Sequence, residues 1–342
     1  MRGGSWNDNP YMLYHPVQFP AMNRSTENGV RCAQYITSDS IPTSAFRQVK
    51  LYEDLDARTL KPVPDAIFNV YREQFSYDRT PLNARVESRQ ENPEGWTLER
   101  ITLDAAYGHE RFAAYLFLPT NSRPPYQTVI YFPSATAMGT SSSRDIEHYY
   151  EVPMFLSFLM KNGRAVLFPV YDGTFERPDM IFALIRNNPE SHLHQYTQSL
   201  IKIVKDFKRS VDYLETRQDI DTGRLAFYGL SYGGFYGGII PAVDDRLKAS
   251  ILLGAGLDPC GLPEACQVNY LPRVRIPTLM LIGKYDPSVA VEPSHFAMFE
   301  LLGTAPQDKQ IKTYETSHIP ERKDIIKETL AWLDRYLGPV KR

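Results

Sequence analysis

The sequence predicts an α/β fold, with a doubly wound and mainly parallel sheet, helices on both of its faces and a short insertion over one edge. Three observations predict it. Short apolar runs alternate along the chain with segments whose apolar residues recur at helical spacing. Most of these runs are nearly continuous, as in strands that are buried on both faces. One run ends in the turn GLSYGG (residues 229–234), which leads directly into a Gly-rich apolar segment.

The first 95 residues precede the expected sheet. Residues 1–40 do not look like the start of a domain, and residues 41–95 are expected to form a linker and one N-terminal helix. That helix is predicted over about 63–76, because apolar residues recur there at helical spacing. Residues 80–95 are expected to be a polar loop. The folded domain is therefore assigned to residues 96–342.

Eight strands and five further helices are expected in that domain. The strands lie at 96–105, 111–118, 127–132, 164–171, 224–229, 247–253, 278–282 and 310–314. The helices lie at about 152–161, through 200–214, from about 232, at 293–302 and near the C-terminus, where Ile326, Leu330, Leu333 and Leu337 are expected to face the core. Residues 172–194 interrupt the alternation at the carboxyl end of a strand, and an insertion there is expected to form a lid.

Composition excludes several classes of function. Of the 342 residues, 43% are hydrophobic and 23% are charged, which is ordinary for a soluble globular protein and sufficient for a large core. The net charge of −2 gives no basic surface for nucleic acid or anionic lipid. The apolar runs are much shorter than the roughly 20 residues that cross a bilayer, and no secretory signal is visible. We therefore expect a cytoplasmic protein that has neither nucleic-acid nor membrane partners.

The three cysteines are Cys32, Cys260 and Cys266. A low and odd count favours a reducing compartment over a disulfide framework. Cys260 and Cys266 nevertheless lie in the same Pro/Gly-containing loop, and the sequence leaves open whether they pair.

Ser231 stands between Gly229 and Gly233 at a predicted strand-to-helix turn, which is the G-x-S-x-G pattern of a nucleophile elbow. In such a turn the serine holds a strained backbone that lifts its hydroxyl above the sheet, and Cβ atoms do not fit at the flanking glycines. The same pattern also occurs in ordinary Gly-rich loops. The preceding strand and the downstream partners of the serine favour the elbow.

A serine nucleophile needs a histidine base and an acid that orients this base, and in folds with such an elbow they follow in the order Ser, Asp or Glu, His. Asp286 directly follows the strand at 278–282, and His318 directly follows the last strand, so both are predicted to converge on Ser231. Asp258 is the rival acid, and Asp286 could also cap a helix. The other histidines are His15, His109, His148, His192, His194 and His295. His192 and His194 form an H-x-H pair that could bind metal, but no Cys or carboxylate pattern accompanies it, and we predict no metal site.

A tetrahedral intermediate needs two N–H donors. The backbone of Tyr232, directly after the serine, is one candidate. The second is expected from the small-residue loop after strand 127–132, either from Ala135 or from Ser134. Tyr171 at a strand end and Phe182 in the insertion are candidate residues of the substrate pocket.

With these residues the chain resembles the α/β-hydrolases of the acetyl xylan esterase, dienelactone hydrolase and prolyl-oligopeptidase-like group. More narrowly, it resembles the hydrolase module at the C-terminus of some bacterial serine/threonine protein kinases. The resemblance spans roughly residues 70–340 and is carried by residues 125–133, 163–174, 211–217, 229–234 and 332–340. It implies the α/β-hydrolase fold, the triad of Ser231, Asp286 and His318, and ester hydrolysis. This chain departs from the pattern at Tyr232, where Trp is common.

Residues 1–36 resemble the closing segment of a formylglycine-generating-enzyme-like domain. The stretches RGGSW (residues 2–6) and GVRC (residues 29–32) carry this resemblance, with Val30 in place of the usual Phe. The segment is far too short to build that fold. We expect a poorly ordered remnant of a larger multidomain gene.

We therefore expect a serine carboxylesterase that acts through an acyl-enzyme without cofactor or metal. Short-acyl or small aromatic esters are the expected substrates, because no large apolar lid helix indicates a lipid site. A prolyl-oligopeptidase-like peptidase and a non-catalytic binding module are the alternatives. The roughly 60 polar residues ahead of the first strand leave no room for the β-propeller that gates such peptidases. Acyl-length preference and oligomeric state, including a homo-oligomer, stay open.

Overall fold

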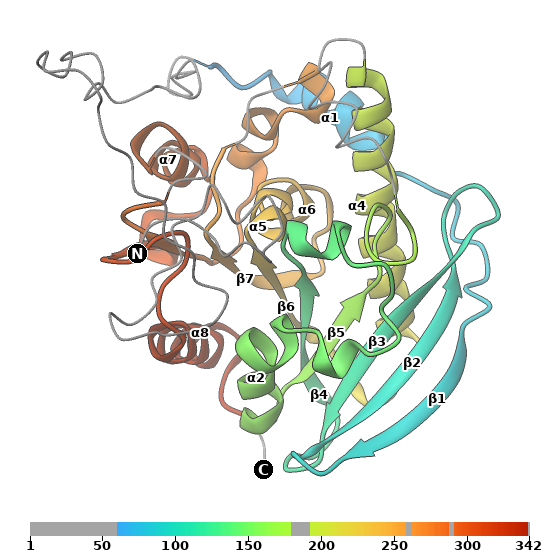
Figure 1. Ribbon diagram of the computed structural model, residues 1–342. Helices are drawn as coiled ribbons and strands as arrows, with labels where there is room; N and C mark the ends of the chain where they lie inside the picture. Colours follow the sequence, from blue (N-terminus) through green and yellow to red (C-terminus); the bar gives the residue numbers. More distant parts are fainter. Residues whose placement is uncertain (1–59, 179–191, 258–260, 287–290, 341–342) are drawn as a thin grey trace, which may run out of the picture.

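The computed structural model describes residues 60–178, 192–257, 261–286 and 291–340. They form one nine-stranded sheet, in the order β1-β2-β3-β5-β4-β6-β7-β8-β9, with helices on both faces (Figure 1). Strands β4 to β9 are parallel, whereas β1, β2 and β3 join them as antiparallel strands. The predicted doubly wound α/β fold is confirmed.

The strands are short, and the central ones are apolar. Their bounds are β1 Arg85–Asn92, β2 Trp96–Asp104, β3 Arg111–Pro119, β4 Tyr126–Phe132, β5 Ala165–Pro169, β6 Ile220–Leu230, β7 Leu247–Leu253, β8 Thr278–Gly283 and β9 Lys309–Tyr314. The helices are α1 Asp65–Glu73, α2 Ser157–Asn162, α4 Leu193–Glu215, α5 Tyr232–Tyr236, α6 Ile240–Val243, α7 Ala297–Leu301 and α8 Arg322–Leu337. In the central strands β4, β5, β7 and β8 nearly every side chain is buried, as expected for strands that are covered on both faces.

Two hydrophobic cores lie on the two faces of the sheet. One packs α1, α4, α5 and α7 against it, and the predicted stripe of α4 from Leu200 to Leu214 is fully buried there. The other packs α2 and α8 against the opposite face. The helices therefore shield both faces and leave the strand edges and strand ends as the accessible parts of the sheet.

Two sequence predictions need correction. Residues 80–95 were expected to be loop, but Arg85–Asn92 forms β1, which pairs antiparallel with β2. Almost all of its side chains are exposed, so the strand lacks the apolar alternation by which a strand is recognised. In α8 the buried stripe contains Ile325 and Trp332 beside Leu333 and Leu337, whereas Ile326 and Leu330 are only half-buried.

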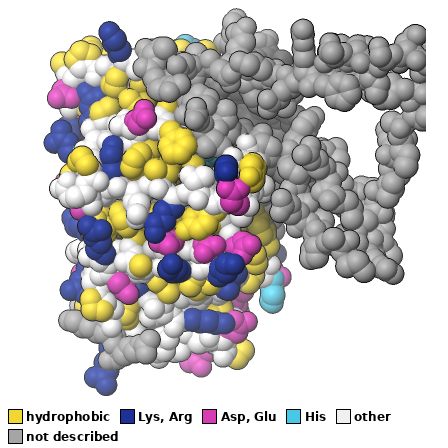
Figure 2. Space-filling view, turned by 90° about the vertical axis from the view of Figure 1, so that its left-hand side faces the viewer, with side chains coloured by type: hydrophobic (Ala, Val, Ile, Leu, Met, Phe, Trp, Pro, Cys, Tyr) yellow, Lys and Arg dark blue, Asp and Glu magenta, His cyan; other side chains and the backbone are white. Residues whose placement is uncertain are grey.

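Charges of both signs are mixed on the described surface. Figure 2 shows one face on which basic and acidic side chains of the described residues are interspersed with hydrophobic ones, without a continuous basic area. Within the described ranges, the helices are all too short or too polar to cross a membrane.

Candidate active site

Ser231 directly follows β6 and has a strained backbone conformation. Its backbone has φ 54° and ψ −104°, although it is not a glycine, and α5 begins at the next residue. Side chains other than glycine rarely adopt positive φ, and such strain costs on the order of 1–3 kcal/mol. The chain thus makes the sharp strand-to-helix turn that the sequence predicted.

The flanking glycines are needed because backbone atoms approach them closely. A Cβ atom at Gly229 would lie 2.3 Å from the carbonyl oxygen of Gly233, and one at Gly233 would lie 2.2 Å from that of Phe132. The Gly233 N–H also donates to the carbonyl of Pro133 at 3.1 Å. The turn is therefore packed directly against the end of β4, which carries the neighbouring loop.

Ser231, His318 and Asp286 form one chain of hydrogen bonds. The Ser231 hydroxyl lies 2.7 Å from Nε2 of His318, and Nδ1 of His318 lies 2.6 Å from Oδ2 of Asp286. The Asp286 side chain is fully buried, while the His318 side chain keeps 18% of its surface exposed. Since the carboxylate accepts from Nδ1–H, Nε2 is left as the acceptor of the serine proton.

The sheet order explains why three residues so far apart in sequence meet. Ser231 follows β6, Asp286 follows β8 and His318 follows β9, and these parallel strands end at the same edge. The two later loops are also joined. The Gly283 N–H lies 3.3 Å from the His318 carbonyl, and a Cβ atom at Gly283 would collide with the carbonyl oxygen of Ser317 at 1.4 Å. Glycine at the end of β8 therefore lets the Asp286 and His318 loops contact each other.

A second histidine contacts the same carboxylate. His295 is fully buried, its Nε2 lies 3.1 Å from Oδ2 of Asp286, and its Nδ1 lies 2.5 Å from the carbonyl oxygen of Ala255. Sequence reasoning missed this contact because His295 falls in a helical segment, away from any strand end. The spacing along the chain holds no signal for it.

The loop after β4 contains Ser134 and Ala135, the two alternatives for the second backbone donor. The Ser134 N–H donates to the carboxylate of Glu151 at 3.2 Å, so the expectation that it stabilises an oxyanion is wrong for this structure. The Ala135 N–H makes no hydrogen bond within the described part of the chain. Ala135 and Tyr232 therefore remain the candidate donors of the original set.

The Glu151 side chain anchors the loop after β4 by hydrogen bonds. Its fully buried carboxylate accepts from the hydroxyls of Tyr131 at 2.8 Å, Tyr150 at 3.0 Å and Ser134, in addition to the Ser134 N–H. Burial raises the pKa of Glu151, and the hydrogen bonds from Ser134, Tyr131 and Tyr150 oppose that shift. The polar loop is thus fixed to the core by one acidic side chain that the sequence analysis did not single out.

Tyr171 does not line an open pocket. It is fully buried, its hydroxyl donates to the Tyr131 carbonyl at 3.0 Å, and its ring stacks on Phe132 with centroids 4.1 Å apart. That prediction is corrected, because the ring supports the end of β4 from inside the core. Phe182, the other pocket candidate, lies outside the described residues.

Several other predictions fall partly or wholly outside the described residues. They include residues 1–40, most of the proposed lid at 172–194, the rival acid Asp258, and Cys32 and Cys260. Cys266 is disulfide-bonded, and both cysteines that could be its partner lie outside the described part. The ring of His192 contacts Gln195 at 3.3 Å, and within the described ranges no three His, Cys, Asp or Glu side chains are placed to share a metal.

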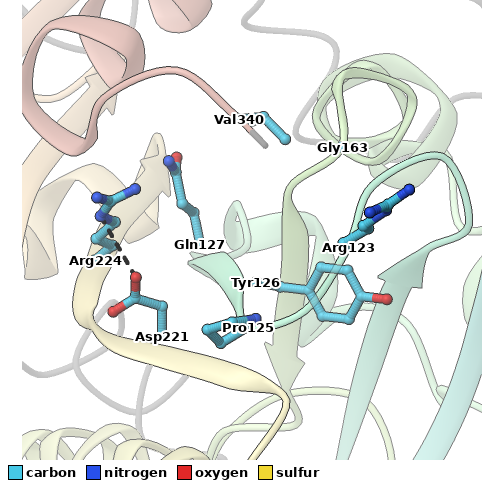
Figure 3. A pocket seen from close by; sticks show the side chains of 8 residues that line it. All are labelled: Arg123, Pro125, Tyr126, Gln127, Gly163, Asp221, Arg224 and Val340. Carbon is cyan, nitrogen blue, oxygen red and sulfur yellow. Dashed lines mark ion pairs between the residues drawn. The ribbon is translucent and has the colours of Figure 1, made fainter. Parts of the chain in front are cut away.

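A small cavity of about 30 Å³ lies at the other end of the strands (Figure 3). It is lined by residues near the starts of β4 and β6, including Gln127, Asp221 and Arg224, together with Val340 near the C-terminus. Asp221 and Arg224 form an ion pair at 3.4 Å within it. This volume holds about one water molecule, so the cavity is too small for an organic substrate.

Solved structures share this architecture. The structure "Acetyl xylan esterase from Paenibacillus sp. R4" matches with a TM-score of 0.59 and 18% identity over 82% of this chain and 98% of its own. The structure "Putative Dienelactone Hydrolase from Klebsiella pneumoniae subsp. pneumoniae MGH 78578" matches with a TM-score of 0.54 and 19% identity over 70% of this chain and 99% of its own. The chain has the α/β-hydrolase fold. The predicted resemblance to acetyl xylan esterases and dienelactone hydrolases is confirmed at the level of the fold.

One curated relative matches part of the chain. "Putative hydrolase YtaP" from Bacillus subtilis (strain 168) is 27% identical over 192 residues, which are 53% of this chain and 60% of that protein. No protein-family model matches the chain. The narrower resemblances, to kinase-linked hydrolases and to a formylglycine-generating-enzyme-like segment, stay predictions.

Proposed function

We propose that this α/β-hydrolase is a serine carboxylesterase that cleaves short-acyl or small aromatic esters. The observation that carries the proposal is the hydrogen-bonded chain from the Ser231 hydroxyl through His318 to the buried Asp286, built on a strained turn. A serine hydroxyl becomes nucleophilic when a positioned base removes its proton, and the base is effective when a carboxylate fixes its tautomer. The names of the similar structures, an acetyl xylan esterase among them, support the short-acyl class.

The proposed reaction has two halves. In the first, Nε2 of His318 takes the Ser231 proton while Oγ attacks the ester carbonyl, and the C–O bond breaks as His318 returns the proton to the leaving alcohol. In the second, His318 deprotonates a water molecule that attacks the acyl-enzyme, which releases the acid and restores the serine hydroxyl. Asp286 stabilises the imidazolium that forms in each half. No step in this scheme requires a cofactor.

The oxyanion of each tetrahedral intermediate would accept hydrogen bonds from the N–H groups of Tyr232 and Ala135. The close contact between Gly233 and Phe132 brings together the two segments that carry Tyr232 and Ala135, which supports this assignment. A donor of this kind typically contributes a factor of about 10²–10³ to kcat.

The proposal is tested with p-nitrophenyl esters of increasing acyl length, the matching p-nitroanilides and a fluorophosphonate label. We expect kcat/KM to be highest for acetyl or propionyl esters, and the label to react at Ser231. Ser231→Ala should lower kcat by about 10⁴–10⁶-fold and abolish labelling. Ser88→Ala, at an exposed serine of β1, is the matched control and should retain full activity.

Two outcomes would overturn the proposal. Cleavage of anilides at rates comparable with those of esters would assign a peptidase. The absence of both ester turnover and labelling would assign a non-catalytic module that keeps the hydrolase fold for binding.

A further inference from the structure

The Tyr150 hydroxyl lies among three polar side chains beside the loop after β4. It donates to Oε1 of Glu151 at 3.0 Å and lies 3.2 Å from the hydroxyl oxygens of both Ser134 and Thr136. The hydroxyl oxygens of Ser134 and Thr136 are 3.1 Å apart, so the three hydroxyl groups form a closed triangle of hydrogen-bonding contacts. Ser134 and Thr136 are the sequence neighbours of Ala135, and the triangle therefore links the two sides of that residue.

The direction of the hydrogen bonds in this cluster follows from the groups present. A carboxylate only accepts, so the hydroxyls of Ser134 and Tyr150 both donate to Glu151. Loss of solvent around the hydroxyl and the nearby Glu151 carboxylate raise the pKa of Tyr150, which keeps this donor protonated. The Tyr150 oxygen then has lone pairs left to accept from the Thr136 hydroxyl.

Tyr150 extends the anchoring by Glu151 to the far side of Ala135. Glu151 bonds directly to the N–H and the hydroxyl of Ser134, which precedes Ala135. The Thr136 hydroxyl, on the other side, contacts Ser134 within the loop. Within the described part of the chain, Tyr150 is the group outside the 134–140 segment to which the Thr136 side chain is hydrogen-bonded. The Tyr150 hydroxyl thus ties the second neighbour of Ala135 to the core.

The ring of Tyr150 is held in place by other aromatic rings. It meets Tyr149 edge-on, with centroids 5.2 Å apart, and Tyr149 packs edge-on against Phe175 at 5.1 Å and Phe168 at 6.2 Å. Phe168 belongs to β5, and both phenylalanines are buried. The packing of these rings therefore fixes the position from which the Tyr150 hydroxyl reaches the loop.

We propose that Tyr150 is a positioning residue that holds the Ala135 N–H in the orientation that binds the oxyanion. A donor of this kind is effective only within about 0.5 Å of its productive position. The Ala135 N–H makes no hydrogen bond within the described part of the chain, so its direction is set by its two neighbours. This role deepens the proposed function and rests on it, whereas the rigidity of the loop can be measured without turnover.

The effect on turnover is tested with Tyr150→Phe. This variant removes the hydroxyl and keeps the ring, and 44% of the Tyr150 surface is exposed, so we expect it to fold. With p-nitrophenyl acetate, kcat should fall about tenfold while KM changes by less than about twofold, because the lost alignment acts in the transition state. Tyr336→Phe is the matched control, since the Tyr336 hydroxyl on α8 also donates to a carboxylate, that of Asp308, at 3.0 Å. It should keep the wild-type kcat.

Thr136→Val removes the partner hydroxyl at an exposed position and should also lower kcat. The double variant Tyr150→Phe/Thr136→Val should lower kcat by less than the product of the two single factors, because both changes remove the same contact. Factors that multiply in full, or an unchanged kcat for Tyr150→Phe, would refute the positioning role. A raised KM with unchanged kcat would instead show that the Tyr150 hydroxyl contacts the substrate, and would overturn the proposal.

The rigidity of the loop is measured independently of turnover. In protein labelled with ¹⁵N-alanine, amide relaxation reports picosecond-to-nanosecond motion at Ala135, and Ala135→Ser assigns the signal. We expect an order parameter of about 0.85 in the wild type and in Tyr336→Phe, and about 0.6 in Tyr150→Phe. An equally rigid Ala135 in folded Tyr150→Phe would overturn the proposal. Absence of ester turnover in the wild type would refute the proposed function and leave the relaxation data interpretable.

Discussion

Replacing Ser231 by glycine should stabilise the fold relative to replacing it by alanine. Alanine keeps the Cβ atom and therefore the strain at φ 54° and ψ −104°, whereas glycine tolerates positive φ. The strain is on the order of 1–3 kcal/mol, and the greater freedom of glycine in the unfolded chain removes about 0.4–1 kcal/mol of the gain. Both variants lose the hydrogen bond to His318, so that contribution cancels. The expected difference in unfolding free energy is about 1–2 kcal/mol in favour of glycine.

The measurement is urea unfolding of the two variants, followed by far-ultraviolet circular dichroism and fitted with a common m value. Thermal midpoints should differ by about 1–3 °C in the same direction for a chain of this size. Because neither variant has a nucleophile, activity does not enter the comparison. An alanine variant as stable as the glycine variant, or more stable, would show that the turn stores no backbone strain.

Glu151→Gln should lower the free energy of unfolding by about 2–3 kcal/mol, because the amide N–H of Gln would face hydroxyl and N–H groups whose hydrogen bonds the carboxylate accepts. The same variant should lower kcat by a larger factor than it raises KM. Since the pKa of Glu151 is raised on folding, the native state binds more protons, and wild-type stability should fall as pH rises from the ordinary carboxyl range to that raised pKa; urea unfolding should show no such component for Glu151→Gln. Gly233→Ala should prevent soluble expression, as its Cβ atom would collide with backbone, whereas Gly223→Ala in the exposed part of β6 should express normally. Asp219→Asn should cost about 1 kcal/mol at pH 7, because hydrogen bonds from Arg217 lower the pKa of Asp219. That cost should disappear as pH falls through the lowered pKa, and an undiminished cost at low pH would exclude the ion pair as its source.

Strands and helices with apolar patterns were predictable from the sequence, and polar elements were not. The buried strands from β4 to β8 and the stripe of α4 carry strong apolar signals, and all were placed within a few residues. β1 was missed because a strand on the sheet edge with exposed side chains has no such signal. Its pairing with β2 comes from tertiary context, which a local pattern does not contain.

The residues of the candidate site likewise divide into those that the sequence predicts and those that it does not. Ser231, Asp286 and His318 follow strand ends, so the topology of a parallel sheet brings them together and the sequence predicts their approach. His295 and Glu151 reach the site through packing of helical segments. Tyr171 was misjudged for a related reason, since a residue at a strand end can point into the core or into the site and the sequence does not distinguish these.

The two outermost strands of the described sheet limit how the molecule can meet another copy of itself. β1 alternates Arg85, Glu87, Arg89 and Glu91, with an irregularity between Val86 and Ser88, and β9 carries Lys309 and Lys312. Charged and irregular edges resist the addition of a foreign strand, which would have to bury these groups. Pairing of an edge strand with a strand of another molecule is therefore disfavoured at both β1 and β9. A dimer of this protein would have to form through helices or loops, and concentrated solutions should resist fibril formation.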